Sequence, residues 1–218
     1  MAWLLTLTLA LAISSENICP YPKEWWKPVT QDTKDWEILP QSVSCEEKKV
    51  ILSKRNELGL FSNFADTAFT LDSKNYASVE GFWQMMKYPE NLEDSSDPRN
   101  DPRVEWPYTR KQVSQMVGEN AKNAGKIANS NLKKLNISWI TYSGQRIEYK
   151  GKDQNLHYEI IVKALKAKME QNPEVRNLLL KTKGLDLLPD HKTEDNPPPA
   201  YRYYDIWMLL RDEILALP

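Results

Sequence analysis

The sequence predicts an α+β fold that is mainly helical, with a few short strands, and that forms a single compact domain. Helical spacing of apolar residues recurs through the second half of the chain, whereas the β-prone segments are short and broken by polar turns. The length of 218 residues suits one good-sized domain and is too short for two full ones. Helices in excess of a few strands are typical of the α+β class.

The composition, with 41% hydrophobic and 27% charged residues, is that of an ordinary globular protein. A formal net charge of −1 gives no overall basic field, so tight non-specific binding to nucleic acid is not expected. The sequence has seven glycines and two cysteines, and it contains no phosphate-cradling glycine loop, no Ser/His/Asp order and no metal-ligand spacing. It therefore predicts neither a cofactor nor a bound metal.

Residues 1–14 are predicted to be a signal peptide. The apolar run from Trp3 to Ile13 is too short to span a bilayer but suits the core of a signal peptide. Ala12 and Ser14 supply the small residues expected before a cleavage site. We therefore expect a secreted or otherwise exported protein without stable membrane insertion. The alternative is a cytoplasmic protein in which this run forms a buried N-terminal strand or helix.

Residues 15–48 are predicted to form an irregular arm, rich in tryptophan and proline, that wraps over the domain of residues 49–218. Cys19 and Cys45 are the only cysteines. In an exported chain such a pair most often forms a disulfide, here tying the N-terminal extension to the domain. In a cytoplasmic chain both are plain thiols. Neither has a neighbouring histidine, which argues against metal binding and thiol catalysis.

The first elements of the domain are short. Residues 49–53 are apolar and β-prone, and they predict the first core strand. Residues 69–76 predict a hairpin around the polar turn 72–74. Ser78 is a favourable N-cap for the helix that follows.

The middle of the chain predicts a loop, a helix and a hairpin. The loop, over residues 91–107, is polar. Thr109 is expected to cap a helix that runs to about Asn129. Residues 137–149 contain aromatic and β-branched residues around Ser143-Gly144 and predict a second hairpin.

The last third of the chain predicts three helices. The clearest is capped by Asp153 or Asn155 and ends before Pro173. Pro173 begins the next helix, which stops at Gly184, and a proline-punctuated loop follows over residues 195–200. The final helix offers six apolar residues to the core: Ile206, Trp207, Leu209, Leu210, Ile214 and Leu215.

The helix after Ser78 carries an unusual set of side chains. Glu80, Trp83, Gln84 and Lys87 share one stripe at helical spacing. The other residues are expected to supply the packing around it: Phe82, Met85, Met86 and Tyr88. An acid, an indole, an amide and an amine on one face of an amphipathic helix indicate a functional site. The alternative is that Glu80 and Lys87 are solvated charges and Trp83 is a core aromatic.

The segments Ser62-Asn63-Phe64, Ser78–Gln84 and Lys87 together resemble the signature of the NADAR family, also called YbiA-like. That signature runs from a Ser-Asn-Phe turn through a short hairpin to a helix with Ser-x-Glu and Gln-x-x-Lys. Later blocks are also similar, at residues 164–169, 178–182 and 206–211. The resemblance implies one NADAR-like domain over residues 49–218. One stretch, Asp195–Tyr201, departs from the Asp-x-x-Trp-Gly pattern that many members carry.

The resemblance implies an N-glycosidase. Family members cleave N-glycosidic bonds in phosphoribosylamino-pyrimidine intermediates of riboflavin synthesis, or in ADP-ribose attached to nucleobases or proteins. When the leaving group departs, the ribosyl carbon gains oxocarbenium character. A carboxylate is then needed either to stabilise this positive charge or to deprotonate water. Glu80 and Lys87 are the catalytic candidates, and for Lys87 an electrostatic role is preferred to imine formation. The expected partner is a nucleotide-like or ADP-ribosyl substrate, and nucleic acid enters only as a modified substrate.

Substrate binding is predicted for side chains that bind phosphate, accept from ribose hydroxyls or stack on a base. His191, near Asp190, is included because its loop is expected to border the cleft, whereas His157 is interpreted as structural. The full set of candidates is Asn63, Phe64, Trp83, Gln84, Arg55, Trp139, Tyr142 and His191.

Two other functions remain open. A pocket of this kind can recognise ADP-ribose or another nucleotide without cleaving it, and the altered stretch before the last helix favours this binding module. The other open function is an interaction protein that binds a partner through the tryptophan-rich arm. That function would not explain Glu80 and Lys87. The sequence sets no oligomeric state.

Overall fold

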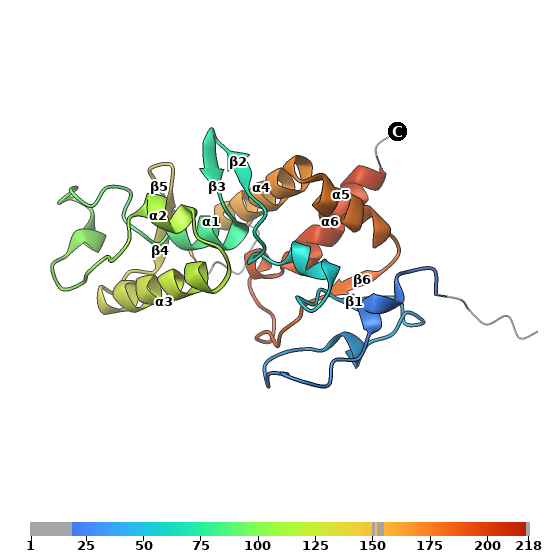
Figure 1. Cartoon of the computed structure of the whole chain (residues 1–218). Helices are drawn as coiled ribbons and strands as arrows, with labels where there is room; N and C mark the ends of the chain where they lie inside the picture. The colour runs from blue at the N-terminus through green and yellow to red at the C-terminus, as the bar shows by residue number, and fades with distance from the viewer. Residues whose placement is uncertain (1–18, 150, 152–154, 217–218) are drawn as a thin grey trace, which may run out of the picture.

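The structure is a computed structural model that describes residues 19–149, 151 and 155–216 (Figure 1). The described residues form six α-helices: α1 (Val79–Met85), α2 (Arg110–Ser114), α3 (Gly118–Lys134), α4 (Leu156–Gln171), α5 (Pro173–Lys181) and α6 (Tyr203–Leu215). They also form six short strands: β1 (Lys49–Ile51), β2 (Phe69–Leu71), β3 (Lys74–Tyr76), β4 (Trp139–Tyr142), β5 (Gln145–Glu148) and β6 (Asp186–Leu188). The predicted signal peptide lies outside the described residues.

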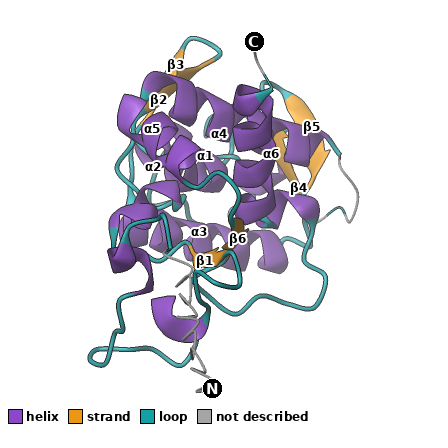
Figure 2. Ribbon diagram, turned by 90° about the vertical axis from the view of Figure 1, so that its right-hand side faces the viewer, coloured by secondary structure: helices purple, strands orange, loops and turns teal. Residues whose placement is uncertain are grey.

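The predicted α+β class is confirmed: a helical body carries three separate two-stranded sheets. Helix α4 contacts α1 on one side and both α5 and α6 on the other (Figure 1). β2 pairs with β3, and β4 with β5, as antiparallel hairpins, whereas β1 pairs in parallel with the distant β6. Figure 2 shows how small these sheets are beside the helices.

Both predicted hairpins are confirmed, and their turns explain why they form. The residues at the tips, Asp72 and Ser73 in one hairpin and Ser143 and Gly144 in the other, all have positive φ. Two consecutive residues with positive φ give a turn whose twist matches that of the strands it joins. The strand predicted over residues 49–53 is shorter than expected, and its partner β6 was not predicted because three residues give no periodic pattern.

Helix α1 begins as predicted, with the Ser78 hydroxyl accepting a hydrogen bond from the Gly81 amide at 2.9 Å. The prediction that this helix is amphipathic is wrong, because all seven of its residues are buried. Gly81 allows this burial: a Cβ atom there would lie 2.5 Å from the Met116 carbonyl oxygen and 2.9 Å from that of Val113. Helix α1 is therefore a buried central element.

The single helix predicted from Thr109 to about Asn129 is wrong, because the structure has two helices there. Thr109 does cap the first, α2, through a capping box, but α2 ends at Ser114 and α3 begins at Gly118. The carbonyl of Ser114 accepts from the Ala77 amide at 3.1 Å, and the Gly118 amide donates to the Phe64 carbonyl at 3.2 Å. These bonds to distant segments replace the helical bonds at the break.

The last three helices begin largely as predicted. Asn155 caps α4 and Pro173 is the first residue of α5. The expectation that Leu209 and Leu215 of α6 belong to the core is wrong, since their exposed fractions are 43% and 40%. At about 100° per residue, both lie well off the stripe of α6 that carries Trp207 to the core.

Residues 19–48 pack over the β1–β6 end of the domain. Trp25 is fully buried and its indole nitrogen donates to Glu57 Oε1 at 2.8 Å. The Trp26 indole nitrogen donates to the Lys49 carbonyl at 2.9 Å. A disulfide joins Cys19 to Cys45, as expected for an exported chain. In Figure 2 this arm lies at the opposite end of the molecule from the β2–β3 hairpin.

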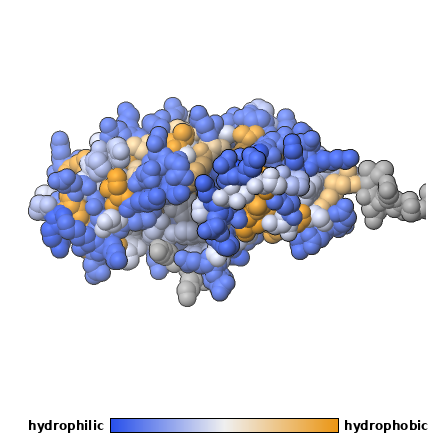
Figure 3. All heavy atoms as spheres, turned by 60° about the horizontal axis from the view of Figure 1, so that its bottom comes forward, coloured by the Kyte–Doolittle hydropathy of each residue, from blue (hydrophilic) through white to orange (hydrophobic). Residues whose placement is uncertain are grey.

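The surface facing the viewer in Figure 3 is mostly hydrophilic, with hydrophobic atoms in small separate patches. Among the described residues, the exposed large hydrophobic side chains are Trp36, Leu92, Leu209 and Leu215. No helix in the described part of the chain is long and apolar enough to cross a membrane.

Candidate active site

Hydrogen bonds at the start of α1 bring two parts of the family-like signature together. The Glu80 amide donates to the Asn63 carbonyl at 2.8 Å. Amides in the first turn of a helix have no partner within the helix, so the Ser62–Phe64 turn supplies one. The Ser78 hydroxyl also donates to the Met116 carbonyl at 2.8 Å. Asn63 and Phe64 therefore lie beside the turn that carries Glu80.

The Glu80 carboxyl is buried, with an exposed fraction of 8%. Its Oε1 accepts a hydrogen bond from Gln84 Nε2 at 2.8 Å, one helical turn further on. Burial raises the pKa of Glu80, and the hydrogen bond from Gln84 and the charge of Lys87 offset part of that rise. A buried acid with a raised pKa, one hydrogen-bond donor and a cation nearby is typical of a catalytic carboxyl.

The Gln84 side chain packs against the backbone of α3 at Gly125, which has no side chain of its own. A Cβ atom at Gly125 would lie 2.0 Å from Gln84 Oε1, so only glycine leaves room for this amide. Gln84 Oε1 and Asn63 Oδ1 are both buried and accept no hydrogen bond from the described residues. Buried acceptors without partners are rare in folded proteins, so both oxygens are uncompensated polar atoms next to the turn that carries Glu80.

Lys87 is predicted on the same helix but lies just past its end, because α1 stops at Met85. Its side chain is nevertheless buried, with an exposed fraction of 1%, and its Nζ lies 4.7 Å from the centre of the Tyr149 ring. Burial raises the pKa of the Tyr149 hydroxyl, but the charge of Lys87 and the surrounding hydrogen bonds outweigh this effect and lower it overall. Lys87 thus places a positive charge beside both Tyr149 and Glu80.

Aromatic side chains from distant parts of the chain surround Trp83. Its ring centre lies 4.9 Å from that of His157 and 4.9 Å from that of Tyr201, both edge-on. Tyr149 contacts His157 at 5.6 Å and Tyr201 at 6.3 Å. Burial and the charge of Lys87 lower the pKa of His157 to about 4, so this histidine is neutral near pH 7. We call these four residues the aromatic cluster.

Sequence reasoning left three members of this cluster out of the site. His157 was interpreted as structural, and Tyr149 and Tyr201 belong to no motif. Each lies at the end of an element: Tyr149 follows β5, His157 is in the first turn of α4, and Tyr201 precedes α6. Tyr201 closes the stretch that departs from the family pattern, so this stretch still contributes to the site. Only tertiary packing brings the three side chains to Trp83.

Two lysines approach Phe64, which lies beside the turn that carries Glu80. Lys54 Nζ lies 5.3 Å from the centre of the Phe64 ring, and Lys122 Nζ lies 5.7 Å from it. The charges of both lysines act on Glu80 and lower its pKa, against the larger effect of burial. Both side chains are partly exposed, so their ammonium groups are accessible to solvent. Neither lysine was singled out in the sequence.

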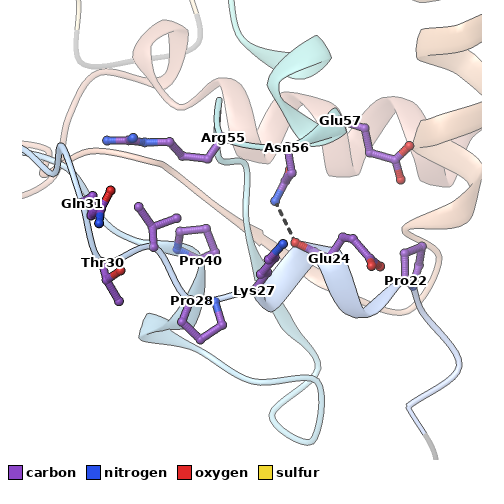
Figure 4. A pocket seen from close by; sticks show the side chains of 11 residues that line it. Pro22, Glu24, Lys27, Pro28, Thr30, Gln31, Pro40, Arg55, Asn56 and Glu57 are labelled. Carbon is purple, nitrogen blue, oxygen red and sulfur yellow. Dashed lines mark hydrogen bonds between the residues drawn. The ribbon is translucent and has the colours of Figure 1, made fainter.

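The structure does not bring Arg55 to Glu80. Its guanidinium donates to both carboxylate oxygens of Glu37, at 2.8 and 2.7 Å, and to the Asp32 carbonyl at 2.7 Å. Arg55 lines a cavity of about 830 Å³ beneath the arm, which Figure 4 shows from close by. In that cavity Asn56 reaches across to the Glu24 carbonyl. The phosphate-binding role predicted for Arg55 thus has no support from its position.

Tyr142 and Trp139 also lie apart from Glu80. Tyr142 donates to Asp72 Oδ2 at 2.6 Å and packs on Phe82, which projects from the face of α1 opposite Glu80. Trp139 lies against two guanidinium groups, those of Arg146 at 4.2 Å and Arg99 at 4.9 Å.

His191 is connected to Lys54 through one residue, Asp190. Its Nδ1 lies 2.8 Å from Asp190 Oδ1, and the same carboxylate forms an ion pair with Lys54. The His191 ring also stacks on Tyr203 with 6.2 Å between ring centres. His191 was predicted to border the site. Its connection to the site is a contact with Asp190, and Asp190 holds Lys54 near Phe64.

Comparisons with known proteins give one distant likeness. No family model matches the chain, and no curated protein matches it significantly. The NMR structure of the Escherichia coli protein YbiA matches with 21% sequence identity and a TM-score of 0.46, over 75% of this chain and 82% of that one.

Proposed function

We propose that this protein is an N-glycosidase that hydrolyses the bond between a nitrogen and C1′ of a ribose phosphate or ADP-ribose. The observation that supports this most directly is the buried Glu80 carboxyl, which accepts from Gln84 and lies near the Lys87 ammonium. The resemblance of the Ser62–Phe64 and Ser78–Gln84 segments to the NADAR signature points to the same chemistry.

The reaction needs a carboxylate where positive charge develops. Water attacks C1′ and forms the new C–O bond as the C1′–N bond breaks, and the bonding electron pair leaves with the nitrogen. Glu80 stabilises the oxocarbenium-like transition state and accepts the proton of the attacking water. The leaving nitrogen takes a proton from Lys87 or from solvent. The raised pKa of Glu80 makes it a stronger base than an ordinary carboxylate.

The remaining groups fit the parts of such a substrate. Asn63 Oδ1 and Gln84 Oε1 are buried without a partner among the described residues, and they accept hydrogen bonds from ribose hydroxyls or a base amine once the substrate displaces the atoms that cover them. Trp83 and Tyr149 of the aromatic cluster supply flat surfaces for a nucleobase. Lys54 and Lys122, which lie beside Phe64, make the phosphate contacts that were predicted for Arg55.

The test is a substrate panel. The protein is incubated with ADP-ribosylated DNA, ADP-ribosylated protein, NAD and a phosphoribosylamino-pyrimidine, and release of the base or acceptor is followed by mass spectrometry. Release from at least one of these by the wild type, and not by Glu80→Gln, supports the proposal. No release from any member of the panel by the folded protein contradicts it.

A second candidate is a binding module for ADP-ribose or a similar nucleotide. The stretch Asp195–Tyr201 favours it, because it departs from the Asp-x-x-Trp-Gly pattern that many NADAR members carry. Saturable binding of ADP-ribose with no release from any substrate would identify this function. Binding followed by turnover would exclude it.

We also propose that the protein acts outside the cytoplasm. The Cys19–Cys45 disulfide supports this place of action, because structural disulfides persist in oxidising compartments. A substrate met there is nucleotide-derived material released by a host or a neighbouring cell. Mass spectrometry of secreted material tests the proposal: a mature chain beginning near Ser15 supports it, and an abundant cytoplasmic form with both thiols free contradicts it.

A further inference from the structure

A ligand-sized cavity lies behind α1, on the side away from Glu80. Its volume is about 550 Å³, within the range of about 300–1,000 Å³ that is usual for small-molecule sites. Met85 of α1 lines it, and the other walls come from β3, from α2 and from the turn between β4 and β5. At about 100° per residue, Met85 and Glu80 project from nearly opposite faces of α1. This cavity is therefore distinct from the candidate active site.

The cavity carries more positive than negative charge. Lys74, Lys111 and Arg110 line it, and Glu90 is the acidic residue among its lining residues. Glu90 is partly engaged already, since its carboxylate accepts from the Gly144 amide at 3.0 Å and so holds the β4–β5 turn in place. Lys74 and Lys111 are exposed, so their ammonium groups are free to reach a ligand.

Arg110 is a largely buried cation, with a side-chain exposed fraction of 14%, and its ion-pair partner is Glu90. Its hydrogen bonds go to uncharged oxygens: the Tyr88 carbonyl and the Thr141 hydroxyl, both at 2.9 Å, and the Thr141 carbonyl. Its distance to Glu90 is 3.7 Å, beyond hydrogen-bond length. Burial lowers the pKa of Arg110 to about 10. A largely buried charge whose ion pair is this long gains from an added anion.

Two tyrosine rings, one of them packed against Phe69 and Phe82, form an aromatic wall in the same cavity. Tyr76 and Tyr142 both line it, and both pack edge-on against Phe82, with ring centres 4.8 and 5.6 Å apart respectively. The Tyr142 hydroxyl is fixed by its hydrogen bond to Asp72. A preformed aromatic wall next to a cluster of cations suits a ligand with a flat ring and an anionic group.

We propose that this cavity binds a small aromatic phosphate about the size of a mononucleotide. The phosphate lies at Lys74, Lys111 and Arg110, and the ring lies against Tyr76 and Tyr142. Lysine and arginine donors suit a phosphate, and tyrosine faces suit any base. The inference does not depend on glycosidase activity, because none of these side chains belongs to the Glu80 site.

The test uses adenosine 5′-monophosphate as the probe, followed by isothermal titration calorimetry on the full chain. Adenosine and inorganic phosphate are the two comparison probes, since each carries one half of the proposed ligand. We expect the nucleotide to bind, and both halves to bind at least about tenfold more weakly. Equal binding of inorganic phosphate would contradict the role of the aromatic wall, and failure of the nucleotide to bind would overturn the proposal.

Two matched double variants locate the binding. Lys74→Gln with Lys111→Gln removes the exposed cations of this cavity, and we expect it to weaken nucleotide binding by about tenfold or more. Lys163→Gln with Lys181→Gln removes the same number of exposed lysines from α4 and α5, outside this cavity and outside the Glu80 site, and should leave this binding unchanged. Binding that both variants weaken equally, or that neither variant weakens, would overturn the proposal. A thermal melt checks that both variants fold.

Discussion

At the scale of single residues, the candidate site depends on how burial changes ordinary side chains. Glu80 is an ordinary carboxylate in the sequence, and what makes it a candidate base is its place inside the protein beside Gln84 and Lys87. The motif predicted Glu80 and Gln84 because both belong to one local helix. It did not predict Tyr149, His157 or Tyr201, because their contact with Trp83 depends on packing between distant elements.

The pKa of Glu80 predicts the acid limb of the activity. Burial raises this pKa above its ordinary value of 4.5, so the ionised base is lost at a higher pH than for an exposed glutamate. We expect the acid limb of kcat/KM against pH to have its midpoint above 4.5. Gln84→Met removes a hydrogen bond to the carboxylate and should move that midpoint further up. A midpoint at or below 4.5 in the wild type, or a downward move in the variant, would contradict this role.

Lys168 predicts a pH dependence of stability. It is fully buried in α4, its Nζ donates to the Ser62 carbonyl at 2.9 Å, and burial lowers its pKa from 10.5 to about 7. Between these two pKa values the unfolded chain binds more protons than the folded one, so this lysine makes stability rise with pH from about 7 to 10.5. Below that window both states are charged and the full cost of burial applies.

The measurement compares wild type and Lys168→Met by denaturant unfolding at pH 6.5 and pH 9. We expect the wild type to gain, relative to the variant, on the order of 2 kcal/mol over this interval. Because other titrating groups are common to both proteins, their contributions cancel in the difference. Parallel stability curves for the two proteins would show that Lys168 is not desolvated in the folded state.

At the scale of elements, local signals predicted where elements begin and long-range contacts decided where they end. Ser78, Thr109 and Asn155 cap helices as the sequence indicated, since a cap is a property of a few neighbouring residues. The break between α2 and α3 depends on hydrogen bonds with Ala77 and Phe64, and no local pattern in the sequence predicts these bonds. The pairing of β1 with β6 joins the two ends of the domain, and no local pattern in the sequence predicts its register.

Glycines on two helices predict different consequences of adding one methyl group. At Gly125 of α3 the new Cβ atom meets the Gln84 side chain, so Gly125→Ala should displace that amide from Glu80 and lower activity. Stability should change little, because alanine favours a helix over glycine by about 1 kcal/mol and offsets some of the strain. The measurements are kcat on the active substrate and a thermal melt.

Gly81→Ala is the contrasting variant. Its Cβ atom meets the backbone carbonyls of Met116 and Val113, which cannot rotate away, so it should lower the melting temperature markedly. Equal melting temperatures for the two variants would contradict the close packing of α1 against the α2–α3 junction. Full activity in Gly125→Ala would show that the position of Gln84 does not matter.

At the scale of the whole molecule, the arm and the domain share one core. Trp25 of the arm is fully buried, and the disulfide fixes the segment that carries it. The sequence predicted an arm that wraps over the domain, and composition alone did not show that one of its tryptophans is part of the core. Proline-rich segments have no periodic pattern, so the depth of Trp25 follows only from the tertiary structure.

The disulfide predicts a stability that depends on redox conditions. A sequence separation of 26 between Cys19 and Cys45 corresponds to a loop whose closure stabilises the fold by about 3–4 kcal/mol. Cys45→Ser should therefore lower the melting temperature, and a reducing agent should lower that of the wild type to the same value. The reducing agent should have no effect on the variant. A wild-type melt that is unchanged on complete reduction would contradict the prediction.

The central claim is that Glu80 carries out the chemistry, and the most direct test is the kcat of Glu80→Gln on the substrate that proves active. Glutamine keeps the shape of the side chain and removes the charge, so we expect a loss of about 10²–10⁴-fold in kcat. The melting temperature should stay close to that of the wild type, because a carboxylate in the first turn contributes only about 0.3–1 kcal/mol through the helix dipole. A folded Glu80→Gln protein with wild-type kcat would contradict the account.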